Sequence, residues 1–293
     1  MPWVFVLIWS TGFIVARYGM PHSPPMSFLA WRYALSALAF ALWVWLARPS
    51  WPVGGAQWGH LALTGILMHG GYLGGVWSAV KLGMGAGTVA LIVGLQPVLT
   101  AIWVARQAAT GSAASTPVGR RQWLGLLLGL VGLALVVSRK LGLGEVHALN
   151  LGLALLALLA ITAGTLYQKR FVKACDVRSA NLIQLLAALA LTLPLALLEQ
   201  ESVQWVPQLL GALAWSVLAL TLGGSSLLYL LIQQGAATRV TSLMYLVPPC
   251  TAVLAWLLFD EPLGGLTLVG IALTVVGVAL VVRAPATSMA AGR

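Results

Sequence analysis

Hydrogen-bonding and aromatic side chains stand within long apolar stretches of this sequence. His69 and Tyr72 are three residues apart, so they share one face of a helix, and Trp77 follows in the same stretch. Polar groups placed among so many apolar neighbours need partners. The pair provides either hydrogen bonds and an aromatic surface for a small molecule, or a hydrogen bond between two packed helices. The spacing alone leaves both interpretations open.

A second set of neutral donors and acceptors lies in other apolar stretches. Tyr229 and Gln233 are four residues apart and share a helix face. An apolar pocket with a few placed polar groups suits a small zwitterionic or amphipathic solute. We therefore treat ten residues as candidate substrate-binding positions: Trp9, His69, Tyr72, Trp77, Gln96, Thr162, Ser226, Tyr229, Gln233 and Tyr245.

Arg32 is the one full charge well inside an apolar stretch. It is either a cation that binds a carboxylate or gates a path, or a structural side chain that pairs with a neighbour or reaches toward the nearer water interface. Its place about one turn from the end of its stretch favours the structural role. We therefore do not count it among the binding residues.

Two prolines, Pro97 and Pro248, lie near the middle of apolar stretches. Proline removes a helical hydrogen bond and bends or hinges a helix. Kinked packing would explain each proline by itself. Their equivalent positions in the two halves of the chain, described below, suggest that both act as hinges.

The elements that hold these residues are predicted by composition. Hydrophobic residues make up 60% of the chain and charged residues only 8%, whereas a soluble domain carries about 25% charged residues. The apolar stretches are continuous and about twenty residues long, enough to cross a bilayer as helices. We predict an all-α polytopic membrane protein with ten transmembrane helices at 2–18, 27–47, 58–80, 86–106, 121–138, 148–168, 178–198, 208–232, 237–259 and 264–283.

Charge distribution predicts the orientation and the partners. The net charge is +10, but the basic residues are scattered between apolar stretches, so no nucleic acid is expected. Most Lys and Arg fall in loops on the same side as the N-terminus, which places both termini in the cytoplasm. The expected location is the bacterial inner (plasma) membrane. The expected partners are the lipid bilayer and a small molecule.

The two halves of the chain resemble each other. The segment 95–101 (LQPVLTA) aligns with 246–252 (LVPPCTA), and 132–137 (GLALVV) aligns with 277–282 (GVALVV). The offsets are 151 (246 minus 95) and 145 (277 minus 132) residues. Five helices per half is an odd number, so the second half enters the membrane from the opposite face. We predict two inverted five-helix repeats, 1–140 and 141–293, that form one transport domain around a central cavity.

Four segments resemble a known family: Leu7–Phe13 (LIWSTGF), Phe28–Tyr33 (FLAWRY), Ala90–Pro97 (ALIVGLQP) and Phe259–Pro262 (FDEP). They are similar to the EamA-type ten-helix members of the drug/metabolite transporter superfamily. The family includes YddG-type exporters of aromatic amino acids, and more distant relatives carry nucleotide sugars or triose phosphates. The resemblance implies that helices 1, 3, 4, 6, 8 and 9 enclose the cavity, while helices 5 and 10 stand at the periphery.

The expected function is export of small organic metabolites, amino acids first and aromatic or hydrophobic ones included, by alternating access. The alternatives are a carrier of another solute class, such as a nucleotide sugar or a drug-like cation, or a membrane-embedded enzyme. The HExxH, GxSxG and GxxxxGK[ST] motifs are absent, so we expect no enzyme activity, ATP hydrolysis, metal or cofactor. The six acidic residues fall in loops or at helix ends, which favours gradient-driven export or exchange over proton coupling. The alternative is that a weaker titrating group such as His69 takes part.

Small residues suggest close helix packing at two places. Gly70, Gly71, Gly74 and Gly75 form overlapping small-xxx-small pairs, which we assign to packing. The Gly125 and Gly129 pair is consistent with a dimer interface or with packing inside one chain. The oligomeric state stays open, and a monomer is sufficient for the predicted mechanism.

Overall fold

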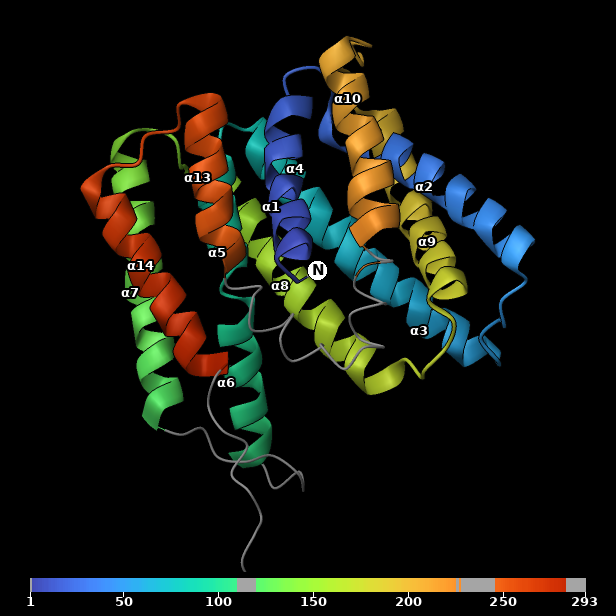
Figure 1. Ribbon diagram of the computed structural model, residues 1–293, viewed down its shortest axis with the longest axis horizontal. Coiled ribbons are helices and arrows are strands. Elements are labelled where there is room, and N and C mark those ends of the chain that lie inside the picture. The colour runs from blue at the N-terminus through green and yellow to red at the C-terminus, as the bar shows by residue number, and fades with distance from the viewer. Residues whose placement is uncertain (1, 110–119, 225–226, 228–245, 283–293) are drawn as a thin grey trace, which may run out of the picture.

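The computed structural model describes residues 2–109, 120–224, 227 and 246–282, and all regular elements in these ranges are helices (Figure 1). The all-helical prediction is therefore confirmed for the described residues. The elements are α1 (Pro2–Gly19), α2 (Pro25–Ala47), α3 (Gly55–Gly65), η1 (Ile66–Gly71), α4 (Tyr72–Lys81), α5 (Ala86–Val93), α6 (Gln96–Ala109), α7 (Arg120–Gly142), α8 (Ala148–Phe171), α9 (Val177–Leu198), α10 (Pro207–Trp215), η2 (Ser216–Gly223), α13 (Val247–Phe259) and α14 (Gly265–Val282).

Length and apolar composition mark four of the described helices as able to cross a membrane: residues 25–47, 123–142, 148–171 and 177–198. Shorter apolar helices occupy 4–19, 86–100, 207–223, 247–259 and 265–280. Large apolar side chains cover the outside of the bundle; Leu197 and Leu198 are 78% and 76% exposed. Such a surface suits lipid rather than water. Parts of the predicted stretches 208–232 and 237–259 lie outside the described residues, so the count of ten spans stays a prediction.

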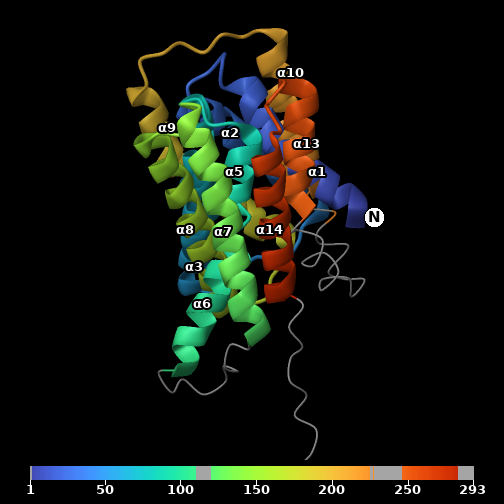
Figure 2. The same cartoon turned by 90° about the vertical axis from the view of Figure 1, so that its left-hand side faces the viewer.

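The helices form two groups that meet at α1, α4, α5 and α8 (Figure 1). On one side α7 packs against α14, and on the other side α2 packs against α9. Between them α4 packs on α8, and α1 packs on α13 and α10. Figure 2, in which the left-hand side of Figure 1 faces the viewer, shows α7 and α14 side by side at the front of the molecule. These two helices correspond to the predicted peripheral spans 5 and 10.

Three predicted stretches are broken rather than continuous α-helices. The π-helical segment η1 separates α3 from α4, and the π-helical segment η2 follows α10. Between α5 and α6 the chain makes a short turn at Gly94 and Leu95, so that Pro97 is the second residue of α6. Pro248 is likewise the second residue of α13. The first turn of a helix tolerates proline because its N–H would lack an intrahelical acceptor there.

Glycines bring helices into close contact. A Cβ on Gly75 would lie 2.6 Å from the Leu153 carbonyl oxygen of α8, and a Cβ on Gly71 would lie 2.9 Å from the Ala160 Cβ. The prediction that these glycines serve packing is confirmed. On the other side, a Cβ on Gly277 of α14 would lie 2.5 Å from Gly129 N of α7. The glycines of α7 therefore pack inside this chain.

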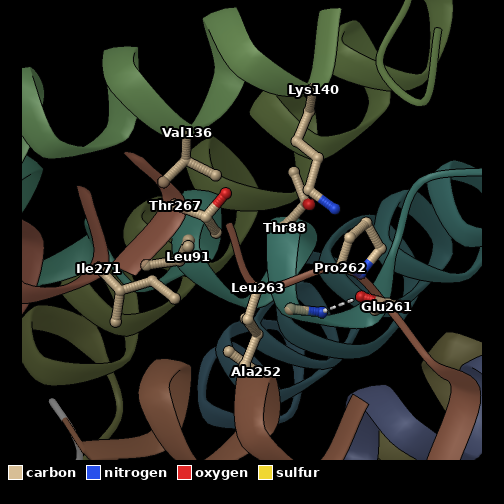
Figure 3. Close-up of a pocket in the computed structure, with 11 residues that line it drawn as sticks. Thr88, Leu91, Val136, Lys140, Ala252, Glu261, Pro262, Leu263, Thr267 and Ile271 are labelled. Atoms are coloured by element: carbon tan, nitrogen blue, oxygen red, sulfur yellow. Dashed lines mark hydrogen bonds between the residues drawn. The ribbon is translucent and has the colours of Figure 1, made fainter. Parts of the chain in front are cut away.

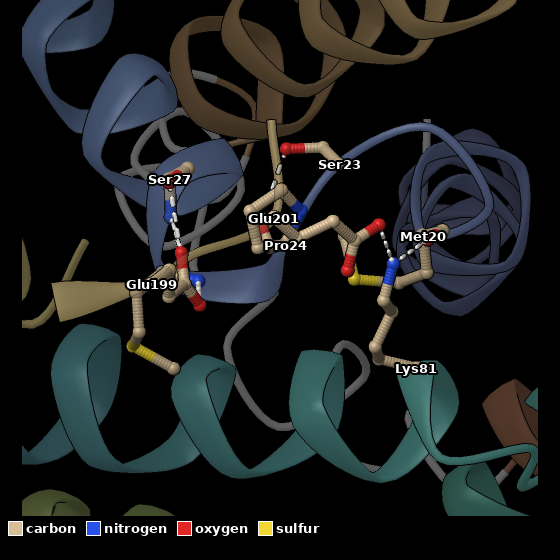
Figure 4. A network of polar contacts seen from close by, with 8 residues as sticks. Met20, Ser23, Pro24, Ser27, Lys81, Glu199 and Glu201 are labelled. Carbon is tan, nitrogen blue, oxygen red and sulfur yellow. Dashed lines mark hydrogen bonds and ion pairs between the residues drawn. The ribbon is translucent and has the colours of Figure 1, made fainter. Parts of the chain in front are cut away.

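One end of the bundle is formed by the loops 20–24, 82–85, 143–147, 199–206 and 260–264. The last three of these loops carry five of the six acidic side chains, so we call this end the carboxylate end. There Glu199 accepts hydrogen bonds from Met26 N at 2.9 Å and Ser27 N at 2.7 Å, and so caps α2 (Figure 4). Lys81 Nζ donates to the Met20 carbonyl at 2.9 Å and pairs with Glu201 at 2.5 Å. These bonds join the loops after α1, α4 and α9.

Two more carboxylates hold the N-terminus of α5. Glu261 accepts from Ala86 N at 2.9 Å and Gly87 N at 3.4 Å (Figure 3), and Glu145 accepts from Gly85 N at 3.0 Å and pairs with Lys140 at 2.5 Å. Anions at a helix N-terminus are favoured by its free N–H groups and dipole. Beside them lies a small cavity with room for about one water molecule. The carboxylate end therefore connects α5 to the loops before α8 and α14.

Candidate functional site

A larger cavity of about 110 Å³ lies where α1, α2, η1, α4, α8 and η2 meet. Four of the predicted binding residues line it: Trp9 from α1, His69 from η1, and Tyr72 and Trp77 from α4. The rest of its described lining is Gly12, Phe13, Arg32, Met68, Leu73, Ile161, Leu220 and Thr221. The cavity is thus mostly apolar, with a few polar groups.

Two other predicted binding residues make bonds between or within helices instead. Gln96 Nε2 donates to Thr165 Oγ1 at 2.9 Å, which links α6 to α8. Thr162 is buried, and its hydroxyl donates to the Leu158 carbonyl at 2.7 Å. Neither belongs to the described lining of the cavity. The remaining four candidates lie outside the described residues: Ser226, Tyr229, Gln233 and Tyr245.

The two π-helical segments both supply side chains to the cavity. Segment η1 contributes Met68 and His69, and segment η2 contributes Leu220 and Thr221. The segments begin 150 residues apart (216 minus 66), within the offsets of the sequence repeat. The Thr221 hydroxyl donates to the carbonyl of Ser216, five residues earlier, at 2.9 Å. π turns inside α-helices are frequent at functional sites.

Of the roles that the sequence left open for Arg32, one is wrong: its side chain does not reach toward an interface. Only 7% of it is exposed, and it lines the cavity. Its Nε and Nη2 lie 3.4 and 3.3 Å from Thr221 Oγ1, and its guanidinium carbon lies 5.4 Å from the centre of the Trp77 ring. The structural reason is that α2 packs against η2, so the face of α2 that carries Arg32 is directed into the bundle.

Two donors of this cavity have no hydrogen-bond partner within the described part of the chain: Arg32 Nη1 and Trp77 Nε1. All six carboxylates belong to the described residues, and none forms an ion pair with Arg32. A buried ion without a counter-ion costs several kcal/mol. As far as the described residues show, the cavity is therefore an electropositive site in which two donors lack an acceptor.

Aromatic side chains behind the lining fix its shape. Phe28 packs on Trp77 with ring centres 6.2 Å apart, and Phe5 packs on Trp9 at 5.3 Å. The fully buried Tyr33 donates its hydroxyl hydrogen to the His69 carbonyl at 2.8 Å. That bond satisfies a backbone acceptor in η1, where the regular helical pattern is interrupted. The cavity walls are thus held by a second layer of side chains.

The arrangement is suited to binding rather than to bond making. It presents one guanidinium, an imidazole, a phenol and two indoles around an apolar space. Among the described residues no group of three or more His, Cys, Asp or Glu side chains is placed to hold a metal ion. Stacking surfaces and donors in this combination recognise a small solute with an acceptor group.

Comparison with known proteins adds a family match. The model of the EamA-like transporter family matches the chain twice, at residues 3–138 and 149–283. A probable amino-acid metabolite efflux pump of Salmonella typhimurium is 24% identical over 93% of this chain and 90% of its own length, and one from Escherichia coli is similar to the same degree. The uncharacterized transporter YvbV of Bacillus subtilis is also 24% identical, over 94% of this chain and 88% of its own. A crystal structure with 18% identity shares the fold, with a TM-score of 0.64 over 95% of this chain and 94% of that one.

Proposed function

The chain belongs to the EamA-like transporter family, and on this premise we propose that it exports small organic metabolites, amino acids first, by alternating access through the 110 Å³ cavity. The family and the apolar helices make it a multi-pass membrane transporter. The proposal of amino acids, aromatic or hydrophobic ones included, draws on the names of relatives that are 24% identical. It also draws on the aromatic lining of the cavity.

The proposed architecture is ten spans in two inverted repeats, 1–140 and 141–293, in the bacterial inner membrane with both termini in the cytoplasm. The two family matches fall in the two halves of the chain. The π-helical segments η1 and η2 occupy corresponding positions in them. Both observations support a repeat. The inversion follows from the proposed count, because five spans per half would make the second half enter the membrane from the opposite face.

The observation that carries the proposal is that both halves build one cavity. Trp9, His69, Tyr72 and Trp77 come from the first half, and Ile161 and Thr221 come from the second. An apolar cavity of about 150 Å³ binds benzene, so this smaller one must widen to admit an aromatic amino acid. Movement of the halves about Pro97, near which the chain turns between α5 and α6, and about Pro248, in the first turn of α13, would supply that change.

The lining favours amino acids over the other solute classes. A nucleotide sugar brings two phosphates, whereas the described lining offers one full cation, Arg32. A drug-like cation would meet that same charge with no carboxylate to balance it. Each of the six carboxylates lies in a loop or at a helix end, as the sequence predicted, so gradient-driven export or exchange is the proposed energy source.

Counterflow in liposomes tests the proposal. Purified protein is reconstituted into vesicles preloaded with unlabelled phenylalanine, lysine or a nucleotide sugar, and in each case uptake of the same solute in labelled form is followed. We expect saturable exchange with phenylalanine that a protonophore leaves unchanged, and much less exchange with the other two solutes. Exchange only with the nucleotide sugar or the cation would replace the proposed substrate. No exchange with any solute would contradict transport itself.

A further inference from the structure

The buried charge in the cavity indicates which part of a solute is recognised. Arg32 and Trp77 are 7% and 1% exposed, and each has a donor, Nη1 and Nε1, without a partner among the described residues. The two side chains are in contact, since the guanidinium carbon lies 5.4 Å from the Trp77 ring centre. A carboxylate has two acceptor oxygens, and its charge-assisted hydrogen bonds with a guanidinium are stronger than bonds between neutral groups.

The present partners of Arg32 leave room for such an acceptor. Thr221 Oγ1 takes two N–H groups at 3.3 and 3.4 Å, longer than the roughly 2.7–2.9 Å typical of charge-assisted bonds. The Trp77 ring contacts the guanidinium as a cation–π partner, and this contact does not use up an N–H group of Arg32. Of the donors in the Arg32 fork, Nη1 is therefore available to a solute.

The chain offers no anion to a solute's ammonium group in this cavity. Its carboxylates are all accounted for elsewhere: Glu145 and Glu261 at α5, Glu199 at α2, Glu201 at Lys81, Asp176 at α9 and Asp260 at the end of α13. The residues outside the described ranges contain no Asp or Glu either. The described lining therefore supplies a partner for a solute's carboxylate, the buried Arg32, and no carboxylate for its ammonium group.

We propose that the cavity selects organic acids: a carboxylate pairs with Arg32 and Trp77, an apolar or aromatic body packs on Trp9 and Phe13, and an amino group is not required. This inference rests on the proposed transport function and narrows it. Deaminated acids are then substrates at least as good as the amino acids that share their side chains.

The first experiment compares three ligands that share one aromatic ring. Thermal unfolding of the purified protein in detergent is measured with 3-phenylpropionate, which has the carboxylate alone, with phenylalanine, which has both groups, and with phenylalaninamide, which has the ammonium alone. A ligand that binds the folded state raises the midpoint. We expect 3-phenylpropionate to raise it at concentrations no higher than phenylalanine requires, and phenylalaninamide to leave it unchanged.

The second experiment changes the cation. Arg32→Gln should weaken the response to 3-phenylpropionate at least about tenfold, the effect of truncating one partner of a buried charge pair. Arg32→Lys keeps the charge but loses the planar fork, so its response to 3-phenylpropionate should fall between those of Arg32→Gln and the unmodified protein. Arg139→Gln removes an equal charge from an exposed position on α7 and should behave like the unmodified protein.

Three results would overturn the inference: a midpoint shift with phenylalaninamide as large as that with the acid, a tenfold preference for phenylalanine over 3-phenylpropionate, or an unchanged acid response in Arg32→Gln. If Arg32→Gln does not fold, the comparison of the three ligands and the response of Arg32→Lys decide whether the inference holds. The unfolding assay does not require transport. Binding of acids without counterflow would therefore contradict the transport proposal, whereas counterflow without acid selectivity would contradict only this inference.

Discussion

Gly132 of α7 and Gly270 of α14 lie face to face, so closely that a Cβ on Gly270 would be 2.7 Å from the Gly132 carbonyl oxygen. The repeat pairs Gly132 with Gly277 and Gly125 with Gly270. In the structure Gly132 meets Gly270, and Gly277 in turn meets Gly125 and Gly129. The contact between Gly132 and Gly270 is therefore equivalent, by the repeat, to the contact between Gly277 and Gly125. A two-fold axis between identical units produces this pattern of paired contacts. The α7–α14 contact therefore behaves as an interface between two copies of one unit.

We expect Gly270→Ala to destabilise the protein by about 1–3 kcal/mol, because the added methyl group must push two helix backbones apart. The thermal unfolding midpoint of the purified protein measures the effect. Gly152→Ala in α8 is the matched control, since a Cβ there meets nothing within 4 Å. It should be neutral or slightly stabilising, as alanine is the better helix former. Equal midpoints for the two variants would show that the contact is looser than described.

Glu261→Ala should loosen the start of α5. The variant leaves the N–H groups of Ala86 and Gly87 without their carboxylate acceptor. Hydrogen–deuterium exchange of the peptide that covers 84–93 should become several-fold faster, which corresponds to about 1 kcal/mol of local stability. Glu201→Ala is the control because that carboxylate pairs with Lys81, outside α5. If exchange in α5 stays unchanged, Glu145 alone is sufficient to hold the helix.

Thr221→Val should weaken carboxylate binding without removing the cation. Valine has the same shape but cannot accept the two N–H groups of Arg32, so the guanidinium loses its fixed orientation. The loss of about 1 kcal/mol corresponds to roughly fivefold weaker binding of 3-phenylpropionate in the unfolding assay. Thr192→Val on α9 removes a hydroxyl that likewise donates to a backbone carbonyl, at 2.9 Å, and should leave binding unchanged. An equal loss in both variants would point to general destabilisation instead.

Asp176 predicts a pH dependence outside the membrane-spanning segments. Its hydrogen bonds from Arg178, at 2.8 and 2.9 Å, hold the pKa of this carboxyl below its usual value. A lowered pKa in the folded state means that the stabilisation is present above about pH 4 and is lost as the pH falls further. Asp176→Asn should therefore lower the unfolding free energy by about 0.5–1 kcal/mol at neutral pH and by less near pH 3. Asp260→Asn, at an exposed carboxylate, is the control, and an unchanged difference at both pH values would contradict the assignment.

Composition and periodicity were sufficient to predict the helical class and four of the cavity residues. Trp9, His69, Tyr72 and Trp77 are conspicuous because bulky aromatic or polar side chains interrupt an otherwise aliphatic pattern. The same criterion selected Thr162, whose hydroxyl is satisfied by its own helix. A hydroxyl that bonds to the preceding turn and one that faces a solute look identical in a sequence.

Arg32 was misjudged for a different reason. Its depth in the apolar stretch was correct, but depth does not tell which neighbour a helix face meets. The neighbour is Thr221, 189 residues later in the chain and inside a π-helical segment. Hydropathy does not distinguish a π turn from an α turn, because both are equally apolar. The contact that orients the cation was therefore not predictable from either segment alone.

The segments η1 and η2 also change which way their helices face. A π turn holds one residue more than an α turn, so residues on its two sides are out of phase by about 100°. Across η1 the chain changes its main neighbour from α9, which α3 contacts, to α8, which α4 contacts. At the start of η2 the chain likewise changes its main neighbour, from α1, which α10 contacts, to α2, which η2 contacts. A single helix thereby serves two neighbours, and the cavity sits at the level where each change of phase occurs.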